Sequence, residues 1–187
     1  MEIILGSGSP RRKELLKQLG FEFSVMVSDI DESFDSLMPA ADVAPFLAKL
    51  KSNALKESIG ADQLLICCDT VVIESNKILG KPQDVSEASR TLIQLSGKKH
   101  KVMSAVCLVY NNQVIEFNDT TEIEFKVFST EEIDYYIKAY EPYDKAGSYG
   151  IQEWIGHIGA IKIEGSYTNV MGLPTHKLYQ EIKKLKA

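Results

Sequence analysis

A very short connection between two long strand-like segments constrains the fold of this chain most strongly. Residues 101–110 and 114–127 are rich in β-branched and apolar residues, and Asn111-Asn112 lies between them. Asparagine tolerates the backbone of a tight hairpin turn, so the two segments are predicted to pair as antiparallel neighbours. Any sheet that the chain builds must therefore contain this hairpin.

Elsewhere, strand-like and helix-like segments alternate along the chain. Further strand-like runs cover residues 3–5, 64–73 and 158–163, and helical patterns cover residues 10–19, a segment that starts at Asp42, and residues 84–97, 129–140 and 174–185. The run at 64–73 is either one buried strand or two strands that meet at Asp69-Thr70. Alternation indicates an α/β fold, and the hairpin makes its sheet mixed. With 187 residues and no repeat or linker, residues 1–187 are predicted to form a single domain.

Composition excludes several classes of protein. The formal net charge of −5 argues against a general nucleic-acid binder, although it leaves room for a local basic pocket that binds a small anion. The chain has no apolar run long enough to span a membrane and no segment typical of a signal peptide. The 3 cysteines have neither a disulfide pattern nor metal-ligand spacing. We therefore expect a soluble, cytoplasmic protein with no membrane partner.

The first candidate site joins a strand to a helix at residues 7–13. Ser9 is a good N-cap and Pro10 a good first helical residue. Free backbone N–H groups and the helix dipole favour an anion there, and Arg11 and Arg12 add donors suited to phosphate. Because cations at a helix N-terminus oppose the dipole, the arrangement is locally unfavourable without an anion. The alternative is a capped surface helix with solvated arginines.

The second candidate is Asp69, which interrupts a strongly apolar run. A carboxylate in such surroundings must be paired, bound to a metal or raised in pKa, and these environments produce general bases and metal ligands. The alternative is an aspartate that turns the chain between two strands. The residues alone leave both interpretations open.

Two lysines and a glycine-rich segment supply weaker signals. Lys51 borders the apolar stripe of its predicted helix, where it either extends to solvent or reaches a phosphate, and Lys81 lies in a Gly-Lys-Pro turn. Residues 144–152 contain small residues that let a backbone approach a ligand, and the amide of Gln152 could read a base edge. An ordinary turn explains this last segment equally well.

The order of these motifs resembles that of the Maf family, the septum formation inhibitor-like nucleotide pyrophosphatases. The matching motifs are Ser-x-Ser-Pro-Arg-Arg, Asp-Thr, Gly-Lys-Pro-x-Asp, Leu-Ser-Gly-x-x-His-x-Val, Asp-Lys-Ala-Gly-x-Tyr-Gly-Ile-Gln and Gly-Leu-Pro. The resemblance covers essentially the whole chain. It implies a mixed sheet flanked by helices, in two lobes with a central cleft, similar to inosine triphosphate pyrophosphatases.

The resemblance also implies partners and site residues. Members of the family are usually homodimers that use a divalent metal cation, Mg²⁺ or Mn²⁺, and act on a nucleoside triphosphate. By motif, Asp69 corresponds to the proton acceptor, Ser7, Arg11, Lys51 and Lys81 to phosphate contacts, and Glu32 together with Asp69 to the metal site.

Three positions separate the substrate classes of the family, and here they are assigned to Arg11, Thr70 and Gln152, as in the branch that hydrolyses dTTP and UTP. The branch that acts on 7-methyl-GTP has Trp, Gln and Glu instead. Two residues depart from the family pattern: Glu153 stands where glycine commonly follows the glutamine, and Cys68 where alanine is usual.

The expected activity is therefore hydrolysis of dTTP and UTP to the monophosphate and pyrophosphate, with Asp69 activating the attacking water. Modified pyrimidine nucleotides are further candidate substrates. Two alternatives stay open at this point: a nucleotide-binding regulator of cell division that acts through a protein partner without turnover, and a hydrolase that releases orthophosphate.

Overall fold

The computed structural model describes residues 1–185, so the last two residues of the predicted domain over 1–187 lie outside the described part. The chain forms two compact units. Unit 1 contains residues 1–70, 104–119 and 172 onward, and unit 2 contains residues 71–103 and 120–171. Each unit is thus assembled from separate segments of the chain, which accords with the predicted two lobes.

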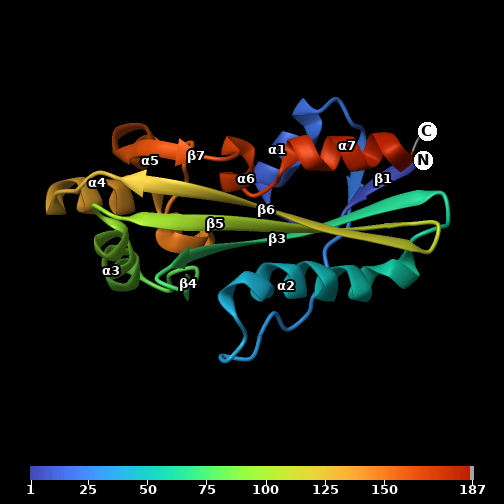
Figure 1. Cartoon of the computed structure of the whole chain (residues 1–187), viewed down its shortest axis with the longest axis horizontal. Coiled ribbons are helices and arrows are strands. Elements are labelled where there is room, and N and C mark those ends of the chain that lie inside the picture. Colours follow the sequence, from blue (N-terminus) through green and yellow to red (C-terminus); the bar gives the residue numbers. More distant parts are fainter. Residues whose placement is uncertain (186–187) are drawn as a thin grey trace. The chain divides into compact units, whose positions relative to one another are not determined.

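The elements follow one another along the chain in an alternating order (Figure 1). The strands are β1 (Glu2–Leu5), β2 (Phe23–Val25), β3 (Gln63–Glu74), β4 (Lys77–Leu79), β5 (Lys99–Tyr110), β6 (Gln113–Phe125) and β7 (Ala160–Glu164). The α-helices are α1 (Pro10–Gln18), α2 (Ala40–Leu55), α3 (Val85–Leu95), α4 (Thr130–Tyr140), α5 (Trp154–Gly159), α6 (Tyr167–Val170) and α7 (Thr175–Leu185). Short 3₁₀ turns cover Lys56–Ser58, Pro142–Asp144 and Ala146–Ser148.

The described strands form one mixed sheet in the order β2-β1-β3-β5-β6-β7, with β4 paired to β3. β1 is parallel to both β2 and β3, whereas β4 and β7 run antiparallel to their neighbours. Asn111 and Asn112, between β5 and β6, have φ angles of 47° and 62°, the backbone that a tight two-residue turn needs. The predicted α/β class, mixed sheet and hairpin are confirmed.

Local capping explains where several helices begin. The Ser9 side chain accepts a hydrogen bond from Arg12 N–H at the start of α1, and Ser129 and Glu132 form a reciprocal capping box at α4. The helix predicted to start at Asp42 begins earlier, at Ala40, because Asp42 N–H already donates to the Pro39 carbonyl at 2.8 Å. Pro45 consequently lies in the second turn of α2.

The predicted strand at 158–163 starts too early, because residues 158 and 159 end helix α5. Gly156 and Gly159 hid this helix, since glycine disfavours helices. A Cβ at Gly159 would lie 2.3 Å from the Phe128 ring, and one at Gly156 would lie 2.0 Å from the Ile151 carbonyl oxygen. Both glycines are therefore required by close packing. The run at 64–73, by contrast, is one strand, β3.

In unit 1, α2 covers one face of the strands, and α1 and α7 cover the other (Figure 1). Beneath α2, a core cluster combines residues of α2 and three strands: Ile4, Leu55, Leu65, Cys67 and Val109. On the opposite face, Tyr179 of α7 packs its ring against Phe21, with ring centroids 6.0 Å apart. This double cover explains why β3 is apolar on both faces.

In unit 2, α3 and α4 pack together and α5 packs against α4. The core beneath them is rich in aromatic rings, and Phe125 lies within 5.2 Å, centroid to centroid, of both Phe128 and Tyr149. His100 is also buried here and shares a hydrogen bond of 2.7 Å between its Nε2 and the Tyr149 hydroxyl. His100 thus belongs to the aromatic core of unit 2.

None of the helices within residues 1–185 combines the length and the apolar character that crossing a bilayer requires.

Candidate active site

The first part of the site is the loop between β1 and α1. β1 and β3 are parallel with Leu5 opposite Ile66, and Gly6 N–H donates to the Ile66 carbonyl at 2.8 Å. A Cβ at Gly6 would lie 2.4 Å from Cys67 Sγ, so only glycine lets the loop follow β3 this closely. The register therefore brings the loop over residues 6–9, and the N-terminus of α1, beside residues 67–70 of β3.

Arg12 of α1 holds this loop together. Its Nε donates to the Gly172 carbonyl at 2.9 Å, its Nη1 to Ser7 Oγ at 3.2 Å and its Nη2 to Thr70 Oγ1 at 3.0 Å. All three acceptors are uncharged, and the first turn of α1 contains no acidic residue. A cation at a helix N-terminus that contacts no carboxylate of the described chain is a ready site for a phosphate.

The Thr70 hydroxyl is fixed from a second side. Its Oγ1 lies 2.8 Å from Ser104 Oγ, which is buried on β5, and 3.4 Å from the Gly172 carbonyl oxygen. Cys68, on the same face of β3, donates through its thiol to the same carbonyl at 3.3 Å. The Gly172 carbonyl oxygen is therefore a shared acceptor for Arg12, Cys68 and Thr70.

The second part of the site centres on Lys51 of α2. Its Nζ lies 2.5 Å from Asp69 Oδ1 on β3 and 2.8 Å from Glu32 Oε2. Burial disfavours the ammonium, but the charges and hydrogen bonds of the two carboxylates outweigh it and raise the pKa of Lys51. Lys51 therefore carries its charge, and it neither extends to solvent nor stands alone.

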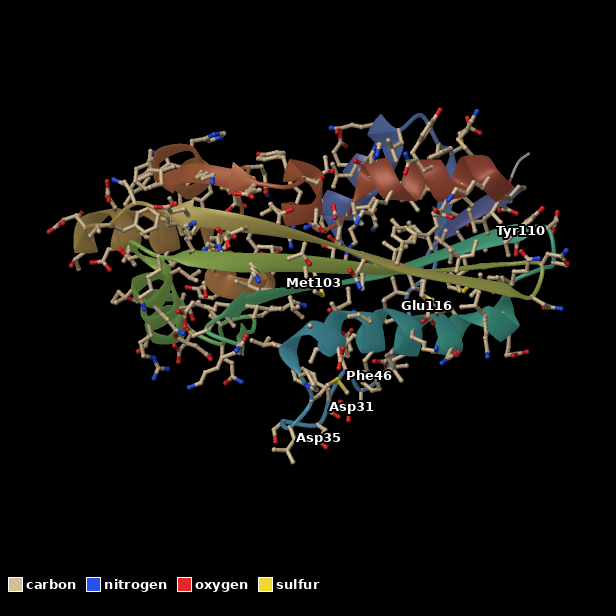
Figure 2. The ribbon with its side chains drawn as sticks, viewed as in Figure 1. Asp31, Asp35, Phe46, Met103, Tyr110 and Glu116 are labelled. Carbon is tan, nitrogen blue, oxygen red and sulfur yellow. The ribbon has the colours of Figure 1, made fainter. Side chains whose placement is uncertain are left out.

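Glu32 comes from the loop between β2 and α2. Figure 2 shows its neighbours Asp31 and Asp35 on this loop, beyond α2. Glu32 is 48% exposed as a side chain, whereas Lys51 is 12% and Asp69 11% exposed. The loop thus brings a partly solvated carboxylate against an otherwise buried ion pair.

Asp69 lies in the middle of β3, so its role as a chain-turning residue is excluded. Its Oδ1 binds Lys51, while none of the described residues donates a hydrogen bond to its Oδ2. Successive side chains of a strand point to opposite faces, so Asp69 faces α2 and Thr70 faces α1. Two clusters therefore lie on the two faces of β3: Glu32, Lys51 and Asp69 on one, and Ser7, Arg12 and Thr70 on the other.

The predicted metal residues fit a cation that arrives with a substrate. Within residues 1–185, no group of three or more His, Cys, Asp or Glu side chains is placed to hold a metal ion. Glu32 and Asp69 nevertheless converge, because each places an oxygen on the same Lys51 nitrogen. Mg²⁺ is commonly bound by one or two carboxylates together with water and substrate phosphates. The pair suits that mode and not an all-protein cage.

The remaining predicted residues, Lys81 and Gln152, belong to unit 2. Lys81 is exposed in the turn after β4, and this turn is tied to the glycine-rich segment because Gly147 N–H donates to the Gly80 carbonyl at 3.0 Å. Gln152 Oε1 is buried, and none of residues 1–185 donates a hydrogen bond to it. A buried amide oxygen in this state is unusual and is expected to have a role.

The sequence names both arginines of α1 as phosphate donors, and the family motif assigns the position to Arg11; in the structure Arg12 donates to Ser7 and Thr70. Arg12 is the third residue of α1, from which its side chain reaches back to the loop. Ser104, which lies against Thr70, is not indicated by the sequence, because a serine in a strand is commonplace. Lys145 lies in the segment 144–152, but the sequence does not indicate its burial beside Glu153.

The fold has relatives among solved structures. The Ham1 protein of Staphylococcus aureus matches over 100% of both chains with a TM-score of 0.57 at 15% identity. A HAM1 protein from Coxiella burnetii matches 98% of this chain and 99% of its own with a TM-score of 0.51 at 13% identity. At these identities the likeness concerns the fold alone, and it agrees with the predicted architecture.

Sequence comparison then identifies the family. The family model described as Maf-like protein matches residues 2–185, and the chain belongs to this family. A protein named dTTP/UTP pyrophosphatase from Flavobacterium johnsoniae is 43% identical over 184 residues, which cover 98% of this chain and 95% of that protein. A protein of the same name from Porphyromonas gingivalis is 48% identical over 185 residues, 97% of this chain and 93% of its own length.

Proposed function

We propose that this chain is a nucleoside triphosphate pyrophosphatase that hydrolyses dTTP and UTP to the monophosphate and pyrophosphate. The names of its curated relatives support the substrate class. The observation that carries the proposal is in unit 1, at β3: on one face Arg12, at a helix N-terminus, donates to three uncharged acceptors, and on the other face Asp69 has a carboxylate oxygen to which none of the described residues donates.

In this mechanism Arg12 and the hydroxyl of Ser7, at the positive end of the α1 dipole, bind phosphate oxygens. Their charge attracts the polyanion to a protein whose formal net charge is −5. Arg11, Lys51 and Lys81 stay predicted phosphate contacts, and Thr70 and Gln152 predicted selectors of the base. Phosphoryl chemistry of this kind depends mainly on positioning and on neutralising charge.

Asp69 is the proposed general base. Through Oδ2 it accepts a proton from a water molecule whose oxygen attacks the α-phosphorus, and the α–β bridging oxygen leaves with pyrophosphate. Lys51 orients the carboxylate by occupying Oδ1. Glu32 and Asp69 would hold the predicted Mg²⁺ or Mn²⁺, which neutralises the developing charge of the phosphates when bound.

A product assay tests this function. The purified chain is incubated with Mg²⁺ and a panel of triphosphates, and the phosphorus products are resolved by ³¹P NMR. We expect equal amounts of pyrophosphate and monophosphate from dTTP and UTP. Release of orthophosphate, or of nothing while the nucleotide still binds, would replace this proposal with a γ-hydrolase or a regulator without turnover.

A further inference from the structure

Residues 150–153 of unit 2 form a tight turn that carries Gln152. Glu153 N–H donates to the Gly150 carbonyl at 3.0 Å, which closes the turn. A Cβ at Gly150 would lie 2.7 Å from Glu153 Cδ and 3.0 Å from Gln152 Nε2. Both side chains therefore fold back over Gly150, which has no room for a side chain of its own.

A tyrosine of α4 ties the two ends of this turn together. Gly150 N–H donates to the Tyr136 hydroxyl at 2.9 Å, and that hydroxyl donates to Glu153 Oε2. Burial, and after it the neighbouring Glu153 carboxylate, raise the pKa of Tyr136, so the phenol keeps the proton that it donates. The turn is thus closed twice, once through the backbone and once through side chains.

The second carboxylate oxygen of Glu153 is also occupied. Its Oε1 lies 3.2 Å from Lys145 Nζ, and the two side chains are only 17% and 9% exposed. With Tyr136 on one oxygen and Lys145 on the other, Glu153 keeps no oxygen unbonded for proton transfer. Its interactions with Tyr136 and Lys145 instead hold the turn at residues 150–153 in one conformation.

The closed turn restricts the backbone from which the Gln152 side chain extends. Its buried Oε1 has no partner in the described part of the chain and could accept a hydrogen bond from a ligand. Uracil and thymine present a ring N–H beside a carbonyl, whereas cytosine presents a bare ring nitrogen beside an amino group. A glutamine amide that rotates by half a turn exchanges its donor and acceptor. It can separate these two edges only when it is held in one orientation.

We propose that Glu153 is a positioning residue for base selection, which holds the turn, and with it the Gln152 amide, through Tyr136 and Lys145. The inference rests on the proposed function, since that function supplies a pyrimidine triphosphate as the ligand. It assigns to Glu153 a role in selectivity and none in bond cleavage.

Two variants test the proposal. Glu153→Gln weakens the contact with Lys145, and Tyr136→Phe removes the hydroxyl that joins Gly150 to Glu153. For each, kcat and KM are measured with UTP and CTP, and Kd is measured by calorimetry with the non-hydrolysable α,β-imido analogues of both. We expect the preference for UTP over CTP to fall about tenfold, mainly through KM and Kd, while kcat for UTP changes by less than about twofold.

Matched controls separate positioning from general loosening of unit 2. Tyr140→Phe removes the hydroxyl of the neighbouring tyrosine, whose ring stacks on Tyr136 at 5.1 Å, and Asp134→Asn neutralises an exposed carboxylate of α4. Both controls should keep the UTP preference of the parent. Near-UV circular dichroism verifies that every variant keeps its packing.

The outcomes also distinguish this inference from the proposed function. If the parent releases pyrophosphate with a UTP preference that both folded variants retain, Glu153 does not position Gln152, although the function stands. If the parent releases no pyrophosphate, the proposed function fails. The inference about Glu153 is then tested only by the ratio of the Kd values for the UTP and CTP analogues. An equal Kd for both analogues in the parent would overturn the inference.

Discussion

Each unit of this chain buries a lysine between two carboxylates. The two clusters differ in whether both oxygens of the buried carboxylate are bonded. In unit 2, both oxygens of Glu153 are occupied, one by Lys145 and one by Tyr136. In unit 1, Lys51 occupies one oxygen of Asp69, and none of the described residues donates to the other. The same pairing of charges therefore stabilises a turn in one unit and leaves a carboxylate oxygen available for chemistry in the other.

The two clusters also differ in how far apart their members lie along the sequence. Lys145 is adjacent to Asp144 and only eight positions from Glu153, so its cluster depends mostly on local chain geometry. Lys51 of α2 pairs with Glu32, from the loop that precedes α2 in the sequence, and with Asp69 of β3, which follows α2. Burying charges costs free energy, and the contacts within the Lys51 cluster depend on tertiary packing, not on neighbours along the chain.

The largest expected effect tests the chemical cluster. Asp69→Asn should lower kcat by roughly 10²–10⁴, because an amide cannot accept the proton that a general base must take. Its KM for UTP and its midpoint of thermal unfolding should change far less. Initial rates of pyrophosphate release measure this, with Asp62→Asn, an exposed carboxylate of the same unit, as the control. Parent-like turnover in Asp69→Asn would remove the distinction between the two clusters.

The next effect concerns stability in unit 2. Burial lowers the pKa of His100 from 6.5 to about 4, and the charge of Glu74 acts in the opposite direction. Between these two values the unfolded chain binds a proton that the folded chain does not, so stability is lost as the pH falls from about 6.5 to 4. The loss should approach roughly 3 kcal/mol.

Urea unfolding at several pH values measures this loss. In His100→Gln the part of the pH dependence that belongs to His100 should disappear, whereas His157→Gln, at an exposed histidine, should keep the parental slope. An unchanged slope in His100→Gln would show that buried polar groups of unit 2 do not govern its acid stability.

A smaller effect distinguishes the two arginines of α1. Arg12→Lys should raise KM for UTP about tenfold, because lysine cannot donate to Ser7, Thr70 and Gly172 together and also present a planar face to phosphate. Arg11→Lys is the matched comparison, and steady-state kinetics measure both. If Arg11→Lys has the larger effect, the sequence-based assignment of Arg11 holds and the contacts of Arg12 are structural.

The smallest expected effect is that of Cys68→Ala. The buried thiol contributes a weak hydrogen bond to the Gly172 carbonyl, and burial raises its pKa, so it is an unreactive neutral group. We expect a loss of less than about 1 kcal/mol in the free energy of unfolding and less than a twofold change in the UTP to CTP preference. A large change in preference would make Cys68 a further part of the base-selecting apparatus.

Much of the fold could be predicted because it depends on neighbours along the chain. The capping residue Ser9, the asparagines of the hairpin and the apolar periods of the helices act over a few residues. The cap and the hairpin are confirmed, and the helices form, although α2 begins two residues before the predicted Asp42. Helix α5 was missed for the opposite reason. Its glycines satisfy a packing requirement against Phe128 that no local pattern reveals.

By itself, the sequence determined the class of fold, the family and the residue types that can bind phosphate and accept a proton. Only the tertiary structure decided which of these residues meet: Arg12 with Thr70, Lys51 with Glu32 and Asp69, and Glu153 with Tyr136. The physical reason is that strand register and helix packing set these contacts. A shift of one residue turns a side chain to the opposite face of a strand and gives it different partners.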